Sequence, residues 1–316
     1  MLTRLTDAVL DATIVYSFDA SGYRRHARRF APADLDVDMT GKVCLVTGAN
    51  GGIGKELARG LAQRGADVYL LCRSAARGEE ARREIADQTG RPVHLVQLDV
   101  SDLAAVREFA KSFEPKRIDV LIHNAGLIPS ERALTSDGLE TTLAVHVIGP
   151  FLLSRLLEPK LRAASPGRVL FISSGGMYTN SLSLNDLDWS QRKYDGVAAY
   201  AQTKRMQVVL TELLAKDWAG KGIVCHSMHP GWADTTGLQN SLPNFTDRMS
   251  GRLRSAAEGA DTALWLAVAP EPTKSSGRFW FDRKPARTHM LPLVTRDKAE
   301  DRTALWTLCQ QRSGVS

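Results

Sequence analysis

The glycine-rich stretch between residues 42 and 64 constrains the fold more than any other part of the chain. It begins with an apolar run from Val43 to Thr47, which has the composition of a strand buried on both faces. Glycines follow at 48, 51, 52 and 54, and apolar residues then recur at helical spacing. A strand that ends in a glycine turn and opens a helix directs backbone N–H groups and the positive end of the helix dipole at one point. That point suits a pyrophosphate, so the stretch predicts a dinucleotide-binding turn.

The spacing of this turn is Gly-x-x-x-Gly-x-Gly, which differs from the Gly-x-Gly-x-x-Gly pattern best known from dinucleotide-binding proteins. Glycine-rich turns also occur for purely structural reasons, because only glycine tolerates positive φ angles and close backbone contacts. The flanking strand and helix favour the dinucleotide interpretation over a structural one.

The composition of the 316 residues is that of an ordinary soluble globular protein, with a formal charge of +6 and an isoelectric point near 9.2. The basic residues form no dense block with interleaved aromatics, so nucleic acid is not an expected partner. Four cysteines stand singly without metal-ligand spacing, which predicts no metal site and favours a reducing compartment. No apolar run reaches transmembrane length and the N-terminus lacks a signal-peptide core, so we expect a cytoplasmic location.

Strand and helix patterns alternate from residue 42 onward. They predict strands at 43–47, 67–72, 93–98, 119–122, 168–172, 222–228 and 278–281, and helices at 75–88, 102–113, 198–218, 256–269 and 298–311, with a long helical stretch through 139–156. This alternation predicts an α/β fold, a single doubly wound, Rossmann-type parallel sheet of about seven strands with right-handed crossovers. We expect residues 39–284 to form this domain, with an N-terminal arm or helix at 1–38 and a C-terminal extension at 285–316.

The N-terminal extension combines apolar positions, among them Leu2, Leu5 and Val9, with a cluster of arginines between residues 24 and 29. The favoured interpretation is a helix and arm packed on the domain. The less favoured one is a basic, amphipathic contact with a membrane surface. The sequence of this segment does not decide between them.

Residues with useful chemistry follow the strands, at the edge where a doubly wound sheet binds its ligand. Each of them could be an ordinary turn residue, but their joint placement favours a ligand site. In chain order they are Gly48, Arg73, Asp99, Asn124 to Gly126, Ser174 and Pro230-Gly231.

Tyr200 and Lys204 lie four residues apart at the start of a long predicted helix, which places their Cβ atoms on one face about 5–6 Å apart. A phenol with a pKa near 10 is a poor acid–base group at neutral pH, and a neighbouring ammonium lowers that pKa. The pair alone is a weak indication, because an exposed helix yields it by chance. Ser174, at a strand end facing the same cleft, could donate a hydrogen bond to a substrate oxygen, although turn and N-cap serines occur at such places too.

The motifs TGANGGIG, LDVSD, HNAG, SSGG, Tyr200-x-x-x-Lys204 and HPG occur in this order between residue 42 and about residue 282. Together they resemble the short-chain dehydrogenase/reductase family. The resemblance implies an oxidoreductase that transfers a hydride between a nicotinamide cofactor and a carbinol carbon of the substrate. It implies that Tyr200 is the general acid–base, that Lys204 holds the nicotinamide ribose and lowers the pKa of the phenol, and that Ser174 orients the substrate oxygen.

The same resemblance assigns the cofactor-binding residues. The glycine turn would hold the pyrophosphate side, the end of the third strand the adenine, the HNAG loop the ribose, and the HPG segment the nicotinamide. These residues are Gly48, Asn50, Gly51, Gly52, Ile53 and Gly54; Asp99 and Val100; Asn124, Ala125 and Gly126; and Pro230 and Gly231, together with Tyr200 and Lys204.

One position departs from the family pattern. The helix after the fourth strand normally carries an asparagine that helps to hold a water in the proton relay, and here that position is His146. The imidazole could hold the water, relay protons itself, or leave the relay broken. We expect a neutral imidazole at pH 7, because the charge of Lys204 opposes its protonation, and an active enzyme whose rate falls below about pH 6.

The expected function is that of an NADP(H)-dependent oxidoreductase that interconverts an alcohol and a carbonyl group. The alternative, which His146 favours, is a nucleotide-binding sensor or scaffold with little or no turnover. A preference for NADP(H) is expected because Arg73 follows Cys72 at the end of the second strand, where NAD-selective proteins place a carboxylate.

Two further expectations concern the partners of the chain. Aromatic and apolar residues between 232 and 255 favour a small, lipophilic carbonyl or alcohol substrate, although a flexible lid would have a similar composition. The helix at 198–218 resembles the family's usual dimer helix, which predicts a homo-oligomer unless the terminal extensions cover that face.

Overall fold

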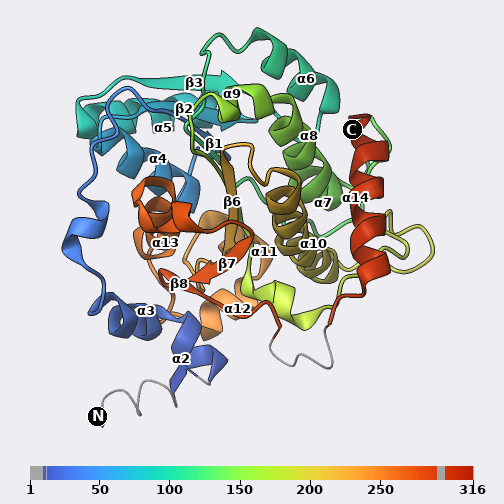
Figure 1. Ribbon diagram of the computed structural model, residues 1–316. Coiled ribbons are helices and arrows are strands. Elements are labelled where there is room, and N and C mark those ends of the chain that lie inside the picture. The colour runs from blue at the N-terminus through green and yellow to red at the C-terminus, as the bar shows by residue number, and fades with distance from the viewer. Residues whose placement is uncertain (1–9, 12, 290–295, 316) are drawn as a thin grey trace.

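An eight-stranded sheet in the order β3-β2-β1-β4-β5-β6-β7-β8 forms the centre of the molecule (Figure 1). The computed structural model describes residues 10–11, 13–289 and 296–315. The first seven strands are parallel, and the short β8 runs antiparallel to β7. The strands are β1 (Val43–Thr47), β2 (Asp67–Cys72), β3 (Val93–Gln97), β4 (Val120–His123), β5 (Gly167–Ile172), β6 (Ile223–Met228), β7 (Arg278–Phe281) and β8 (Lys284–Pro285). The strand order reverses between β1 and β4, and doubly wound sheets bind their ligands beyond the carboxyl ends of the strands at such a position.

Helices cover both faces of the sheet, with α4, α5 and α13 on one face and α6, α8, α10 and α14 on the other (Figure 1). The helices are α2 (Ile14–Phe18), α3 (Ala20–Ala27), α4 (Gly52–Gln63), α5 (Ala75–Thr89), α6 (Leu103–Ser112), α7 (Thr141–Leu143), α8 (Gly149–Leu156), α9 (Glu158–Arg162), α10 (Gly196–Asp217), α11 (Thr236–Ser241), α12 (Pro243–Arg248), α13 (Ala256–Val268) and α14 (Ala299–Ser313). Short turns of other helix types are η1 (Pro32–Leu35), η2 (Ala144–Ile148), η3 (Gly175–Thr179) and η4 (Glu271–Lys274).

The two faces of the sheet bury separate hydrophobic clusters, which explains why the strands are apolar at nearly every position. Side chains alternate across a strand, so Leu45 of β1 packs with α6, α8 and α10, while Cys44 and Val46 pack with α4 and α13. All three are fully buried. The sequence therefore predicts the doubly wound α/β sheet correctly, and the structure adds β8 at its edge.

The sequence predicts one long helix at 139–156, but this stretch is broken into α7, the π-helical turn η2 and α8. In a regular α-helix the carbonyl of His146 would accept from the N–H of residue 150, and Pro150 has none. The wider turn is closed instead by the N–H of Gly149, which donates to the carbonyl of Ala144. The segment at 232–255, whose aromatic and apolar residues favour a lipophilic substrate, contains the two short helices α11 and α12.

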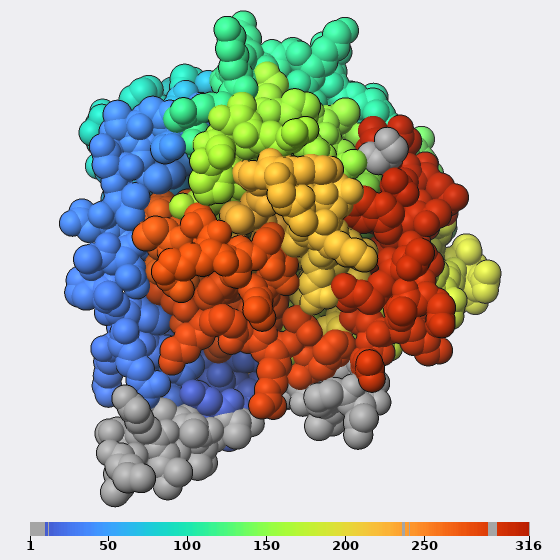
Figure 2. Space-filling view, viewed as in Figure 1, coloured from blue at the N-terminus to red at the C-terminus, as the bar shows by residue number. Residues whose placement is uncertain are grey.

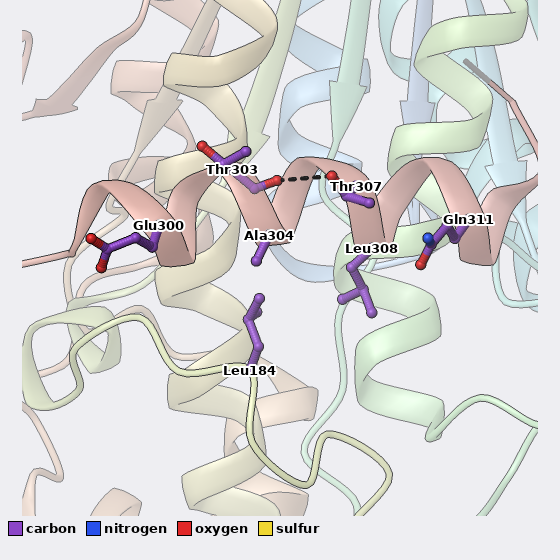
Figure 3. A pocket seen from close by; sticks show the side chains of 7 residues that line it. All are labelled: Leu184, Glu300, Thr303, Ala304, Thr307, Leu308 and Gln311. Atoms are coloured by element: carbon purple, nitrogen blue, oxygen red, sulfur yellow. Dashed lines mark hydrogen bonds between the residues drawn. The ribbon is translucent and has the colours of Figure 1, made fainter.

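The C-terminal helix α14 packs on α8 and α10, with Leu305 and Cys309 fully buried. Figure 2 shows α14, in red, at the surface beside the gold residues of α10. A groove of about 640 Å³ lies between α14 and the loop that carries Leu184, whose side chain points toward Ala304 and Leu308 (Figure 3). None of the residues predicted for the ligand site lines this groove.

A buried ion pair fastens the segment that leads into α14. The guanidinium of Arg205 on α10, 1% exposed, pairs with Asp297 and also donates to the carbonyl of Thr288. Asp297 in turn accepts from the N–H of Leu182 at 2.9 Å. Removal of one member of such a pair leaves the other charge buried without compensation.

We therefore expect Asp297→Ala to lower the free energy of unfolding by about 3–5 kcal/mol, because it leaves the Arg205 charge buried and unpaired. Chemical denaturation monitored by circular dichroism measures the change. Glu271→Ala is the matched control, since it removes an exposed partner of Lys274 and should have a far smaller effect. Equal effects of the two substitutions would contradict the structural role assigned to Asp297.

Candidate active site

The turn after β1 is shaped by close backbone contacts that only glycine permits. Gly48 has φ of +66°, and a Cβ there would lie 2.8 Å from the Cα of Ala125. A Cβ on Gly54 would lie 2.4 Å from Nδ2 of Asn124 and 2.5 Å from the carbonyl oxygen of Gly48. The N-cap of α4 is Gly51, which supplies no side-chain hydrogen bond to the first turn of the helix. The helix N-terminus thus keeps backbone N–H groups for an anionic ligand.

The loop after β4 is fastened directly to this turn. Asn124 donates through Nδ2 to the carbonyls of Thr47 and Gly48 at 3.0 and 3.1 Å. The hydroxyl of Thr47 accepts from the backbone N–H groups of Asn124 and Ala125, both at 3.0 Å. The structure therefore brings the glycine turn and the residues predicted for the ribose into one rigid unit.

Ser174, Tyr200 and Lys204 meet beyond the carboxyl end of β5. Ser174 is the N-cap of η3, and its Oγ accepts from the N–H of Gly176 at 3.2 Å. Burial raises the pKa of Tyr200 above its ordinary value of 10, and a hydrogen bond from Ser174 opposes that shift. Nζ of Lys204 lies 5.4 Å from the centre of the Tyr200 ring. The neighbouring Ser173 is different, because its Oγ donates to the carbonyl of Lys204 and so ties β5 to α10.

The ammonium of Lys204 is almost entirely withdrawn from water, with 3% of the residue exposed. Nζ donates to the carbonyl of Ile172 at 2.7 Å and to Oε1 of Gln207 at 3.1 Å. Burial lowers the pKa of Lys204 to about 7, because the charged form loses its hydration. The backbone of Gly126 is close by, since a Cβ on it would lie 3.7 Å from Nζ. The lysine thus retains one N–H for a ligand at the loop predicted to line the ribose.

His146 is fully buried in η2, and protein groups occupy both ring nitrogens. Nε2 accepts from the backbone N–H of Leu127 at 3.1 Å, so the proton of the neutral ring lies on Nδ1, which donates to Oγ1 of Thr203 at 2.8 Å. Burial and the charge of Lys204 hold the pKa of His146 well below 6.5. This geometry leaves no nitrogen free for a water, so it disfavours two of the three predicted roles, water holder and proton relay.

Pro230 and Gly231 follow β6 and contact a residue that the sequence analysis did not identify. Gly231 has φ of +78°, and a Cβ there would lie 2.2 Å from Nε of Arg254. Arg254 is 1% exposed; it donates to the carbonyl of Pro230 at 3.4 Å and pairs with both carboxylate oxygens of Asp282 at 2.6 and 2.9 Å. Burial would raise the pKa of Asp282, but hydrogen bonds from His26 and Arg254 outweigh it and hold that pKa below its ordinary range.

The same arginine binds the N-terminal segment. This contact is a second feature that the sequence does not predict. Arg254 donates to the carbonyls of Ser17, Phe18 and Asp19 at 2.9, 3.0 and 3.2 Å. The carbonyl of Phe18 also accepts from the N–H of Trp232 at 2.8 Å. The described part of the N-terminal segment therefore packs on the domain beside Gly231, while Leu2, Leu5 and Val9 lie outside the described residues.

The ring of Phe18 reaches the loop that carries Ser174. A Cβ on Gly175 would lie 2.9 Å from Cε2 of Phe18 and 3.0 Å from Nε2 of His229. The rings of Phe18 and His229 meet edge to face, with centroids 4.4 Å apart. Trp232 contacts both Phe18 and Phe245 in similar geometry, at 5.9 and 5.2 Å. No pattern within one element predicts the contacts of Phe18, because they join segments more than 150 residues apart.

The residues predicted for the adenosine end lie at the carboxyl ends of β2 and β3. Arg73 has a side chain 66% exposed, and its Nε is 3.9 Å from a carboxylate oxygen of Asp99. Asp99 accepts from the N–H and the hydroxyl of Ser101, while Val100 is buried. The exposed guanidinium is loosely held, which leaves it available to a ligand.

The fold and this geometry agree with a family model described as short chain dehydrogenase, which matches residues 42–245. This chain belongs to the short-chain dehydrogenase/reductase family. The glycine turn, Ser174, Tyr200 and Lys204 all fall within the matched residues. Membership of this family of oxidoreductases supports a nicotinamide cofactor and a reaction between alcohols and carbonyl compounds.

Two family members and one solved structure illustrate the similarity. Dehydrogenase/reductase SDR family member 12 from Homo sapiens is 44% identical over 283 residues, 88% of each chain. Retinol dehydrogenase 12 from Homo sapiens is 37% identical over 285 residues, 89% of each chain. The crystal structure of a protein from Beutenbergia cavernae, assigned as an NAD(P)-dependent gluconate 5-dehydrogenase with NADP bound at low occupancy, is 28% identical with a TM-score of 0.60 and covers 77% of this chain and 95% of that one.

Within the part of the chain that the structure describes, no helix has both the length and the apolar character needed to cross a bilayer.

The contacts of His146 predict a fixed tautomer. We expect the ring to stay neutral with its proton on Nδ1 from pH 5.5 to 8, because the Leu127 N–H occupies Nε2 and burial opposes the charged form. Long-range ¹H–¹⁵N correlation spectra of histidine-labelled protein measure both properties. A titration midpoint of the His146 ring near pH 6.5, or a proton on Nε2, would show that the ring does not keep these contacts in solution.

Proposed function

We propose that this protein is an NADP(H)-dependent oxidoreductase that interconverts an alcohol and a carbonyl group, with Tyr200 as the acid–base. The observation that carries the proposal is the convergence of Ser174, Tyr200 and Lys204 from two different elements on one point. A Cβ on Gly176 would lie 3.6 Å from Oγ of Ser174 and 3.7 Å from Cε1 of Tyr200, and Nζ of Lys204 lies 5.4 Å from the centre of the phenol ring. This point lies beside the loop of Gly126, at the edge of the sheet where family members bind their cofactor.

The residues present fit a dinucleotide. Contacts of Gly48 and Gly54 with the Asn124–Ala125 loop leave no room for side chains, and the first turn of α4 has no side-chain cap. In this proposal the glycine turn holds the pyrophosphate, the Asn124–Gly126 loop and Lys204 hold the nicotinamide ribose, and Pro230 with Gly231 border the nicotinamide. When bound, the cofactor supplies or accepts the hydride.

The chain itself handles the proton. Burial favours the protonated phenol, so Tyr200 is suited to donate a proton to a developing alkoxide during carbonyl reduction. Ser174 holds the same oxygen through its hydroxyl. In the oxidation direction Tyr200 must act as a phenolate, and the ammonium of Lys204 stabilises that form. Lys204 therefore has two roles in this proposal, one toward the ribose and one toward the phenol.

A preference for NADP(H) is supported by Arg73 and by the helix that follows it. The guanidinium is exposed, and α5 begins two residues later with Ser74 as its N-cap. A guanidinium can pair with a 2′-phosphate in fork geometry, and a helix N-terminus favours the same negative charge. The Beutenbergia cavernae structure, which contains NADP, gives further support.

A lipophilic substrate is supported by the aromatic side chains around Ser174. Phe18, Trp232 and Phe245 form a continuous series of ring contacts that begins beside Gly175. Such rings favour apolar groups. A relative that is a retinol dehydrogenase, and hence acts on a lipophilic alcohol, agrees with this choice.

Other parts of the expected function stay predictions. A cytoplasmic location is one of them. A homo-oligomer formed through α10 would have to include or displace α14, since α14 packs over that helix. A nucleotide sensor or scaffold with little turnover is the alternative function, and the absence of an asparagine at position 146 favours it.

Tyr200→Phe should abolish turnover and leave NADPH affinity within a few-fold, because it removes the titratable hydroxyl and keeps the ring. Ser174→Ala should cost less, since the phenol can still polarise the substrate oxygen. A panel of carbonyl compounds with NADPH, followed by the loss of NADPH fluorescence, measures turnover. Tyr69→Phe, in β2, is the matched control.

Retention of a tenth or more of the wild-type turnover by Tyr200→Phe would contradict the acid–base role. If the wild type binds NADPH but reduces no compound and oxidises no alcohol, the sensor or scaffold becomes the better account.

Arg73→Ala should lower NADP⁺ affinity roughly ten- to a hundredfold and leave NAD⁺ affinity nearly unchanged, because the guanidinium would contact only the 2′-phosphate. Binding titrations of both cofactors measure the preference. Arg91→Ala, at the other end of α5, is the control and should change neither affinity. If the wild type bound NADP⁺ and NAD⁺ with equal affinity, or if Arg73→Ala kept the full preference for NADP⁺, the role of Arg73 would be refuted.

A further inference from the structure

Gln207 connects the ammonium of Lys204 to the main chain of η2. It lies three residues after Lys204 on α10, on the same helix face. Its Oε1 accepts from Nζ of Lys204 at 3.1 Å, and its Nε2 donates to the carbonyl of His146 at 2.9 Å. An ammonium only donates and a carbonyl only accepts, so a single orientation of the amide satisfies both contacts. With 1% of Gln207 exposed, the bridge is shielded from solvent.

The carbonyl of His146 is available to Gln207 because of Pro150. In an α-helix that carbonyl would be used by the N–H four residues later, which proline lacks. The π-helical turn and the glutamine therefore complement each other, and the buried carbonyl is satisfied by a side chain on the neighbouring helix.

We infer that Gln207 is a positioning residue for Lys204: its buried amide bridges the ammonium to the His146 carbonyl and opens no path for protons. The inference rests on the proposed role of Lys204 toward the cofactor. A carboxamide has no group that titrates near neutral pH, so it fixes the ammonium as a donor but does not relay its proton. Protons exchanged by Tyr200 then pass through the cleft and not through η2.

The electrostatic surroundings of Lys204 make this bridge measurable. Among the described residues, the titratable groups that face Nζ are Tyr200 on the same helix and His146 on η2, and β5 contributes only the carbonyl of Ile172. Burial keeps the phenol and the imidazole neutral at pH 7. The hydrogen bond from Nζ to Oε1 of Gln207 is therefore one of the main interactions that stabilise the charged form of Lys204.

Two substitutions that introduce side chains of similar length should shift the midpoint of the Lys204 pH titration in opposite directions. Gln207→Met removes the acceptor and should lower the midpoint by about one pH unit, the size expected from one hydrogen bond to a charged group. Gln207→Glu supplies a charged acceptor and should raise the midpoint by at least as much. Titration of ¹³C-labelled lysine ε-carbons in the free protein measures it, with the Lys204 signal identified by its loss in Lys204→Met.

NADPH affinity gives a second readout that requires no turnover. At pH 7.5 Gln207→Met should bind NADPH about tenfold more weakly than the wild type, because less of Lys204 is charged before binding. Gln202→Met is the matched control, since Gln202 lies on the same helix and donates to the carbonyl of Ser183. It should leave both the midpoint and the affinity unchanged.

An unchanged Lys204 midpoint in both Gln207 variants would overturn the inference. If Gln207→Met does not fold, Gln207→Glu decides alone, because a raised midpoint supports the bridge and an unchanged one excludes it. Wild-type protein that binds no NADPH would contradict the proposed function instead, and the lysine titration would still test the bridge.

Discussion

A single ammonium, buried where β5, α10 and η2 meet, determines how the polar groups of this protein are arranged. A charge withdrawn from water must be stabilised by polar protein groups. The ammonium of Lys204 donates hydrogen bonds to the carbonyl of Ile172 and to the amide oxygen of Gln207. Gln207 then requires an acceptor for its own N–H groups, which the broken helix at His146 provides. The buried imidazole in turn fixes the loop after β4 through Leu127. The cofactor-side loop is therefore positioned by a chain of contacts that begins at one lysine.

Two buried arginines fasten the terminal extensions to the domain in the same way. Arg205 on α10 pairs with Asp297 ahead of α14, and Arg254 pairs with Asp282 while it binds the N-terminal segment. Each guanidinium donates both to a carboxylate and to backbone carbonyls, so its several N–H groups are used together. A buried pair adds little net stability but tolerates few alternative arrangements. The described parts of both extensions are thus held on the domain by electrostatics as well as by apolar packing.

The features that the sequence predicts are those set by neighbouring residues. The strand composition, the glycine turn at Gly48 and the Tyr200–Lys204 spacing depend on local periodicity, and from these the doubly wound sheet is predicted correctly. Pro150 is a local signal for the broken helix, but the apolar repeat around it favours a continuous one. The contacts of Gln207 with His146, and of Arg254 with the N-terminal segment, join residues 61 and more than 230 positions apart. No pattern within one element contains that information, because such contacts exist only once the sheet has formed.

The binding of the N-terminal segment by Arg254 sets an order on assembly during synthesis. The carbonyls of residues 17–19 are synthesised before the guanidinium that binds them, which is added 235–237 residues later. At about 5–20 residues per second, a ribosome takes on the order of tens of seconds to cover that distance. Through this interval residues 17–19 lack the side chain that binds them, while strands of the sheet are already being made. These three residues can therefore reach their final position only after Arg254 has been made.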